Sequence, residues 1–124
     1  MGELRTEVVS VTTTGSDGSA AGSAVSGVIN GLIENIYLDF HTSAPAGTHD
    51  TTISYTIRGG NILAVANSVT DALFTPRAKP VDLANAAITN AHTRFACNQT
   101  VTVTVAQSNA LTNDVVAYIT YRTV

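Results

Sequence analysis

The sequence predicts an all-β protein: a single-domain antiparallel β-sandwich of the jelly-roll type with an extended N-terminal segment. The first observation is strict alternation, since residues 100–105 place valine and threonine on opposite faces of a strand. The second is the recurrence of short β-branched and aromatic segments between polar loops, which is typical of a sandwich or jelly roll. The third is the length of 124 residues, which fits one domain with one modest core.

The N-terminal segment is expected to be a strand joined to the rest by a flexible loop. Residues 4–13 are rich in β-branched side chains, which favour an extended conformation. Residues 15–22 contain three glycines and indicate a turn or a flexible loop. We therefore divide the chain into an N-terminal strand or arm with its Gly/Ser-rich loop, residues 1–22, and a sandwich domain, residues 23–124.

A short strand is expected at residues 23–27, followed by a long one at 28–41. In the long strand Ile36, Leu38 and Phe40 alternate with polar side chains and Tyr37, which predicts one buried face. The pair Asn30-Gly31 indicates either a tight turn or a β-bulge within this strand. We favour the bulge, because no partner strand returns across a two-residue turn.

The middle of the chain contains the second-clearest alternation, at residues 51–58. There Ile53, Tyr55 and Ile57 form one stripe and predict a strand. The later segments are expected as a strand at 62–66, a strand or helical turn at 70–75, an extended crossing between prolines at 76–83, a loop with at most one helical turn at 82–91, and an edge strand at 92–96.

The C-terminal stretch is predicted to be a hairpin. Residues 100–107 and 115–121 are two strand-forming runs separated by a polar loop of hairpin length. Val101, Val103 and Val105 are expected to form the dry face of the first strand. The second strand places Val115, Ala117, Ile119 and Tyr121 on one side and Val116, Tyr118, Thr120 and Arg122 on the other. A lone hairpin is marginal in water, so the other strands must cover it as a second layer.

Composition and charge exclude several classes of partner. Charged residues make up 12% of the chain, and the net charge is −3 from six basic and nine acidic residues. A weakly acidic chain without a basic cluster argues against nucleic acid. The apolar runs are shorter than the roughly 18 residues of a membrane span, and the N-terminus is charged where a signal peptide would be apolar. We expect no membrane partner and a soluble product that is not secreted, or is released by lysis.

No catalytic or metal site is expected. Asp39, His41 and Ser43 supply the residue types of a hydrolytic triad, but a triad is defined by geometry and not by closeness in sequence. His49-Asp50 is expected to cap a turn, and a metal site made with His41 and His92 is a weaker alternative. The function therefore requires no cofactor.

Three other features are interpreted as structural. Cys97 is the single cysteine, so an internal disulfide and cysteine-ligated zinc are excluded, and we expect a small buried hydrophobe. Asn98-Gln99-Thr100 matches a glycosylation pattern that has no meaning without secretion. Gly59-Gly60 is expected to be a turn.

The tyrosines leave two interpretations open. Tyr37, Tyr55, Tyr118 and Tyr121 could form an aromatic platform for a sugar, or could complete the rim and core of the sandwich. We favour the second interpretation. The chain has no tryptophan, the side chain most often used to stack on sugars.

The order of segments resembles that of small phage head decoration or cement proteins. The similarity is carried by Glu7 to Thr13, Gly31 to His41 with Ser43-Ala44-Pro45, Thr51-Thr52-Ile53, Phe74-Thr75-Pro76-Arg77, and Thr102 to Gln107, so it covers most of the chain. It implies a β-sandwich that is made in the host cytoplasm and assembles, often as homotrimers, on the outer surface of the capsid. It implies no catalytic residues.

The absence of an expected active site, together with this resemblance, predicts a structural, non-enzymatic virion protein that decorates or cements a phage capsid through protein–protein contacts. Its expected partners are the phage major capsid protein and further copies of itself. The runner-up is a carbohydrate- or receptor-binding β-sandwich module of a virion tail or fibre. The candidate capsid or subunit contact is the N-terminal strand, at Glu3, Leu4, Arg5, Thr6, Glu7, Val8 and Val9.

Overall fold

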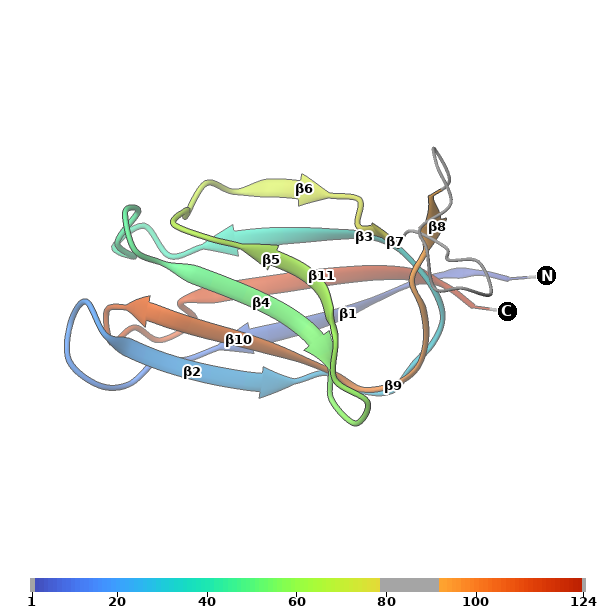
Figure 1. Ribbon diagram of the computed structural model, residues 1–124, viewed down its shortest axis with the longest axis horizontal. Coiled ribbons are helices and arrows are strands. Elements are labelled where there is room, and N and C mark those ends of the chain that lie inside the picture. Colours follow the sequence, from blue (N-terminus) through green and yellow to red (C-terminus); the bar gives the residue numbers. More distant parts are fainter. Residues whose placement is uncertain (1, 79–91, 124) are drawn as a thin grey trace, which may run out of the picture.

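The computed structural model describes residues 2–78 and 92–123, and all regular secondary structure within them is β-strand (Figure 1). The strands are β1 Leu4–Val11, β2 Ala20–Val25, β3 Ile29–Phe40, β4 Asp50–Tyr55, β5 Asn61–Val65, β6 Ala72–Phe74, β7 Arg77–Ala78, β8 Thr93–Arg94, β9 Ala96–Gln99, β10 Val101–Ser108 and β11 Val115–Arg122. Every pairing between these strands is antiparallel. The predicted all-β, antiparallel fold is confirmed.

Most of the strands lie in two facing sheets, between which the chain crosses repeatedly. One sheet has the order β1-β11-β3-β6, and the other has the order β2-β10-β4-β5. Leu32 pairs with Arg122 of β11 and also with Ala96 of β9, so β9 lies on the same side of β3 as β6. Two facing sheets with these crossed connections form the predicted jelly roll. β7 and β8 make a separate two-stranded ribbon.

The predicted C-terminal hairpin is wrong, although both of its strands exist. β10 pairs with β2 and β4, whereas β11 pairs with β1 and β3, so the two strands belong to different sheets. The loop between them crosses the sandwich and is bonded to the end of β1: the Thr13 N–H donates to the Leu111 carbonyl at 3.0 Å, and the Asp114 N–H donates to the Val11 carbonyl at 2.7 Å. Alternation identified the strands but not their neighbours.

The bulge in β3 occurs three residues after the predicted position. β3 continues unbroken through Asn30 and Gly31, which excludes the tight turn. Its register with β11 shifts at Glu34, because Asn35 pairs with Thr120 and the next pair is Ile33 with Tyr121. Gly31 instead marks a close approach of two backbones.

The N-terminal strand belongs to the sandwich. β1 pairs with β11 from Leu4 to Val11, and the Thr123 N–H extends the ladder by donating to the Glu3 carbonyl at 2.9 Å. The boundary predicted after residue 22 falls inside β2. In this structure it therefore separates no structural units, because the strand before the glycine-rich loop and the strand after it contribute to the same two-layer fold (Figure 1).

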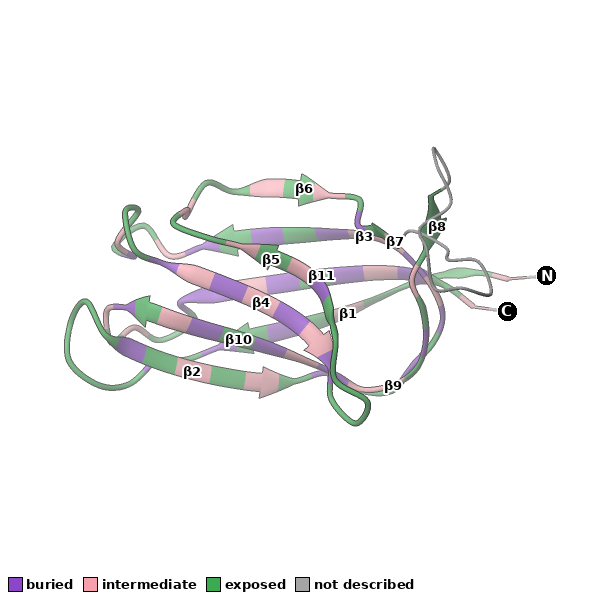
Figure 2. Cartoon of the chain, viewed as in Figure 1, coloured by how far each residue is buried: buried purple, intermediate pink, exposed green. Residues whose placement is uncertain are grey.

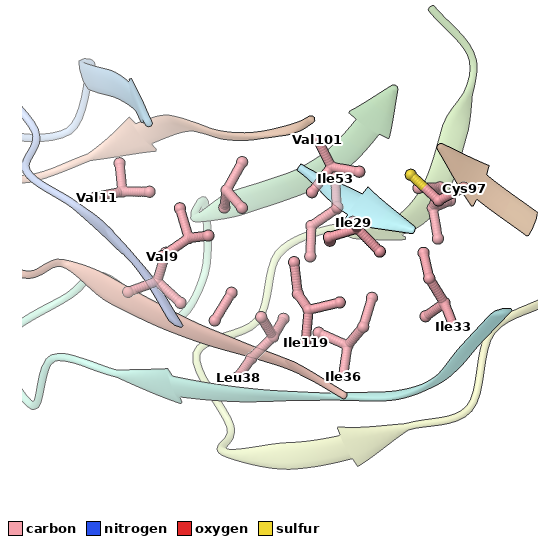
Figure 3. Packing of buried hydrophobic residues seen from close by; sticks show 14 of the residues in the cluster. Val9, Val11, Ile29, Ile33, Ile36, Leu38, Ile53, Cys97, Val101 and Ile119 are labelled. Atoms are coloured by element: carbon pink, nitrogen blue, oxygen red, sulfur yellow. The ribbon is translucent and has the colours of Figure 1, made fainter. Parts of the chain in front are cut away.

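The core lies between the two sheets, and burial alternates along the central strands (Figure 2). The predicted stripe of Val101, Val103 and Val105 is fully buried, as are the inward side chains of β11. They pack with the inward residues of β1, β3 and β4, among them Val9, Val11, Ile29, Ile33, Ile36, Leu38 and Ile53 (Figure 3). Phe40 belongs to the same cluster. The alternating pattern thus predicted the core faces of β3, β4 and β10.

The remaining expectations have mixed outcomes. Residues 70–75 contain the short strand β6 and not a helical turn, and residues 92–96 overlap two strands, β8 and β9. Ile57 is not part of the core stripe, because β4 ends at Tyr55 and the Ile57 side chain is 83% exposed. The loop expected at 82–91 and the second half of the crossing at 76–83 lie outside the described residues.

Candidate functional site

A row of four exposed apolar and aromatic side chains crosses the outer face of the β1-β11-β3-β6 sheet. In register, Val8 of β1 lies opposite Tyr118 of β11, Tyr118 lies opposite Tyr37 of β3, and Tyr37 lies opposite Leu73 of β6. Each alternates along its strand with side chains that point inward, so all four point away from the core. We call these four residues the outer-face row.

The row is accessible and uncharged. Val8 and Leu73 are 54% and 59% exposed, and Tyr37 and Tyr118 are 38% and 37% exposed. The two tyrosine rings lie 6.2 Å apart between centroids at an interplanar angle of 49°. The result is a continuous apolar strip across four strands with two aromatic rings at its centre.

The residues on either side of the row are mostly small or polar. Thr6, Thr120 and Asn35 occupy the next outward positions on one side. On the other side the corresponding positions hold Ser10, Val116 and Asp39. The outer face therefore has an apolar centre and a polar rim, which is the arrangement of side chains found in protein interfaces.

The second exposed feature is the free edge of β1, which lies at the end of its sheet. The Thr123 N–H donates to the Glu3 carbonyl, so the odd-numbered residues of β1 direct their backbone N–H and C=O groups toward β11. By alternation, the N–H and C=O groups of Leu4, Thr6 and Val8 point toward the free edge. The predicted contact residues Glu3 to Val8 lie along this edge, whereas Val9 is buried.

The residues of the candidate triad do not assemble. Asp39 points outward from β3, and His41 follows the strand. The His41 Nδ1 accepts a hydrogen bond at 3.0 Å from the backbone N–H of Ser43, and not from its hydroxyl. This histidine therefore stabilises a turn.

His49 makes a buried polar network that the sequence did not indicate. Its Nε2 lies 2.8 Å from Oδ2 of Asp114, whose Oδ1 accepts a hydrogen bond from the Ser108 hydroxyl at 3.1 Å. The Thr51 hydroxyl lies 3.4 Å from Nδ1 of the same histidine. All four side chains are at most 1% exposed. No substrate can reach these groups, so the network acts on stability.

Asp50 and His92 lie elsewhere. The Asp50 carboxylate accepts the backbone N–H of Asn67 at 3.0 Å, so it stabilises the loop after β5 and does not cap the turn at its own position. His92 borders a shallow hollow of about 400 Å³ that is also lined by Leu32, Arg77, Thr93 and Arg94. Within residues 2–78 and 92–123, no three His, Cys, Asp or Glu side chains form a group suited to a metal ion.

The arginines of this hollow already have partners. Arg77 Nη1 donates to the carbonyls of Glu34 and Pro76 at 3.1 Å and 2.8 Å. Arg94 Nε lies 2.8 Å from Glu34 Oε1, at an angle that makes an ion pair but not a hydrogen bond. Among the described residues of the hollow, Arg94 is thus paired with a carboxylate, whereas Arg77 is held by two carbonyls.

Cys97 is a buried thiol on β9, as predicted. Burial raises its pKa, and its Sγ donates a weak hydrogen bond to the Gln99 carbonyl at 3.2 Å. A protonated, buried thiol is a poor nucleophile. Asn98 is an exposed residue of the same strand.

The tyrosines are divided between the core and the outer face and do not form one platform. Tyr55 and Tyr121 are each 6% exposed and belong to the core. The Tyr55 hydroxyl donates to the Ala96 carbonyl at 2.7 Å, and the Arg58 guanidinium lies 4.4 Å from the centre of its ring. Only Tyr37 and Tyr118 face outward together.

The outer-face row was not predicted because it depends on strand order. Because side chains alternate with a period of two, Tyr118 lies on the opposite face of its strand from the core side chains. The period does not give the strand order. β11 lies between β1 and β3, and this order brings Val8, Tyr118 and Tyr37 into one line.

No protein-family model, curated protein or solved structure matches the chain. In the described residues, no helix is long and apolar enough to cross a membrane.

Proposed function

We propose that the chain is a structural virion protein without enzymatic activity, which decorates or cements the outer surface of a phage capsid through protein–protein contacts. The observation that carries this proposal is the outer-face row of Val8, Tyr118, Tyr37 and Leu73. The row contacts the phage major capsid protein. The proposal rests also on the resemblance described above, which brings the capsid into consideration.

The chemistry of the row supports a protein partner. Interfaces are enriched in tyrosine and depleted of charge at their centre, and a few aromatic residues carry most of the binding energy. Tyr37 and Tyr118 lie at the centre of the row, and both hydroxyls can hydrogen-bond at the rim while the rings are covered. Burying this strip removes apolar surface from water without desolvating a charge.

The jelly-roll fold is shared by proteins of several functions. Jelly rolls occur in viral capsid proteins and also in lectins and cupins. Because the same fold serves different functions, the outer-face row, and not the fold, supports the capsid contact. In this scheme the protein is located on the capsid surface and associates with further copies of itself, for which the resemblance implies a trimer.

The proposal is tested first by location. We expect mass spectrometry of purified particles of the encoding phage to find the chain at hundreds of copies per virion. Particles assembled without it should bind the added purified protein. A count of only a few copies, at one vertex or in the tail, would contradict decoration.

The contact is tested with the added protein. Tyr37→Ser with Tyr118→Ser should abolish binding to those particles while leaving the circular dichroism spectrum unchanged. Thr52→Ser with Thr104→Ser, on the outer face of the other sheet, is the matched control and should bind as the original chain does. Equal binding by both double variants would show that the row is not the contact.

The alternative is a carbohydrate- or receptor-binding module of a tail or fibre, which one observation favours. Tyr37 and Tyr118 present two adjacent rings to solvent, and aromatic rings of this kind stack on sugars. The flanking Val8 and Leu73 add apolar surface and no hydrogen-bonding groups, which suits a protein partner better. Glycan-array binding that is lost in the tyrosine double variant, together with a low copy number, would favour the alternative.

A further inference from the structure

The free edge of β1 lacks proline and bulges, and its charges Glu3, Arg5 and Glu7 lie on the same face of the strand as Val9. Edge strands are commonly protected by proline, by bulges or by inward-pointing charges, because their unpaired N–H and C=O groups can bind another strand. β1 has eight residues, contains no proline and keeps a regular register with β11 throughout. The N–H and C=O groups of Leu4, Thr6 and Val8 are directed to this edge.

We propose that two copies of the chain pair antiparallel through this edge, about a two-fold axis that passes between their Thr6 residues. In this register Thr6 lies opposite the partner's Thr6, Arg5 lies opposite the partner's Glu7, and Leu4 lies opposite the partner's Val8. Each relationship occurs twice because the contact is isologous. The two β1-β11-β3-β6 sheets become one continuous sheet.

The backbone and the charges together favour this register over the two nearest ones. Residues that bond across an antiparallel edge must both direct their backbone groups to it, so even-numbered residues must face even-numbered residues. A shift of two residues one way places Arg5 opposite the partner's Arg5, and the same shift the other way places Glu7 opposite the partner's Glu7. Like charges directly opposite one another are destabilising, whereas opposite charges stabilise the pair.

The side chains of Arg5 and Glu7 are available for this contact. Arg5 is exposed, and its only acidic partner in the described part of the chain is Glu3, two residues away on the same strand. Glu7 is half-buried and makes no hydrogen bond or ion pair with the described residues. The partner's Arg5 would supply the missing cation to Glu7, and Glu7 would in turn meet the partner's Arg5.

The apolar side chains of the edge fit the same register. Leu4 and Val8 are 56% and 54% exposed and lie on the outer face of β1. Pairing covers each with the other across the two-fold axis. The partner's Leu4 then lies beside Val8, so each outer-face row gains one apolar residue from the partner across the shared edge.

This contact closes with two copies and does not lead to a third, since each β1 has one free edge. It therefore predicts a dimer in solution, in contrast to the trimer that the resemblance implies. The edge-paired dimer specifies the proposed self-association but does not rest on the capsid contact. The dimer and the capsid contact can fail separately, because dimerisation is measured without particles.

The test exchanges charges. Sedimentation velocity over a concentration series should show a monomer–dimer equilibrium for the original chain. Glu7→Lys makes both positions basic, and Arg5→Glu makes both acidic, so each variant alone should dimerise about tenfold more weakly, as two cross-strand pairs change from attraction to repulsion. An equimolar mixture of the two variants should restore the dimer, because each acidic edge then meets a basic one.

The control is Asp17→Lys, which changes the charge by the same amount in an exposed loop and should leave the dimer unchanged. Circular dichroism checks that all variants are folded. A mixture that stays monomeric while the original chain dimerises would overturn the register. A chain that is monomeric or trimeric at every concentration would overturn the edge pairing itself.

Discussion

His49 Nε2 lies 2.8 Å from Asp114 Oδ2, and both side chains are completely buried between the two sheets. His49 immediately precedes β4, and Asp114 immediately precedes β11, so the pair links strands of opposite sheets. Phe40 packs edge-on against the imidazole, with ring centroids 5.4 Å apart at 87°. The pair therefore fixes the crossing loop, residues 109–114, against the loop that leads into β4.

Breaking this pair should destabilise the fold strongly. His49→Ala leaves the Asp114 carboxylate buried with only the Ser108 hydroxyl, and removing one partner of a buried pair costs about 3–5 kcal/mol. Urea unfolding followed by circular dichroism measures the loss. His92→Ala, at an exposed histidine, is the control and should change stability by less than about 0.5 kcal/mol.

A second variant tests whether the cost comes from the unpaired carboxylate. Adding Asp114→Asn to His49→Ala should cost less than the sum of the two single changes, because no lone carboxylate then remains buried. Strict additivity would mean that the two side chains do not interact.

β10 should be sensitive to substitution on its valine face only. Val101→Ala, Val103→Ala and Val105→Ala should each cost about 1–3 kcal/mol through lost burial and the cavity left behind. Thr104→Ala, on the exposed face, should cost less than about 0.5 kcal/mol. Equal losses on both faces in the same urea titration would show that a third layer or a subunit covers the threonine face.

The sequence predicted the core face of β10 but not the neighbours of this strand. A period of two is local, so Val101, Val103 and Val105 could be assigned to the core from the sequence alone. Which strand lies beside β10 depends on contacts between distant residues, and the nearest strand in sequence was the wrong choice. The His49–Asp114 pair and the outer-face row depend on the same non-local order, which is why neither was predicted.

Gly31 should tolerate no side chain. A Cβ at this position would lie 2.0 Å from the carbonyl oxygen of Arg122, which belongs to the backbone of a paired strand and cannot move aside. Gly31→Ala should therefore destabilise the protein by more than about 1 kcal/mol. Gly47→Ala, where no atom lies within 4 Å of the new methyl group, serves as the control. Equal midpoints for the two variants in urea would show that β3 and β11 can separate locally.

Stability should fall in mildly alkaline solution because of Cys97. Burial raises the thiol pKa in the folded state above the unfolded value of about 8.5, so between these two values the folded state binds more protons than the unfolded state. The stabilisation is complete below about pH 8.5 and is lost as the pH rises toward the folded value. Urea midpoints at pH 7, 8.5 and 9.5 should decline in the original chain and decline less in Cys97→Ala. If the urea midpoint falls equally with pH in the original chain and in Cys97→Ala, the decline belongs to other groups. Tyr55 is one such group, because burial also raises its pKa.

The last prediction concerns the N-terminal strand, whose composition and glycine-rich loop suggested a detachable arm. Deleting residues 1–14 removes all of β1, exposes the edge of β11 and takes Val9 and Val11 out of the core. Burying each valine is worth about 1.5–3 kcal/mol, and a domain of this size has only about 5–15 kcal/mol of net stability. The truncated chain should therefore lose cooperative unfolding in far-UV circular dichroism. Deleting only residues 1–2 leaves the bond from the Thr123 N–H to the Glu3 carbonyl and should preserve the fold. If a chain without residues 1–14 still unfolds cooperatively, β1 can leave its sheet without loss of the fold. β1 would then be free to pair with another copy as an exchanged strand.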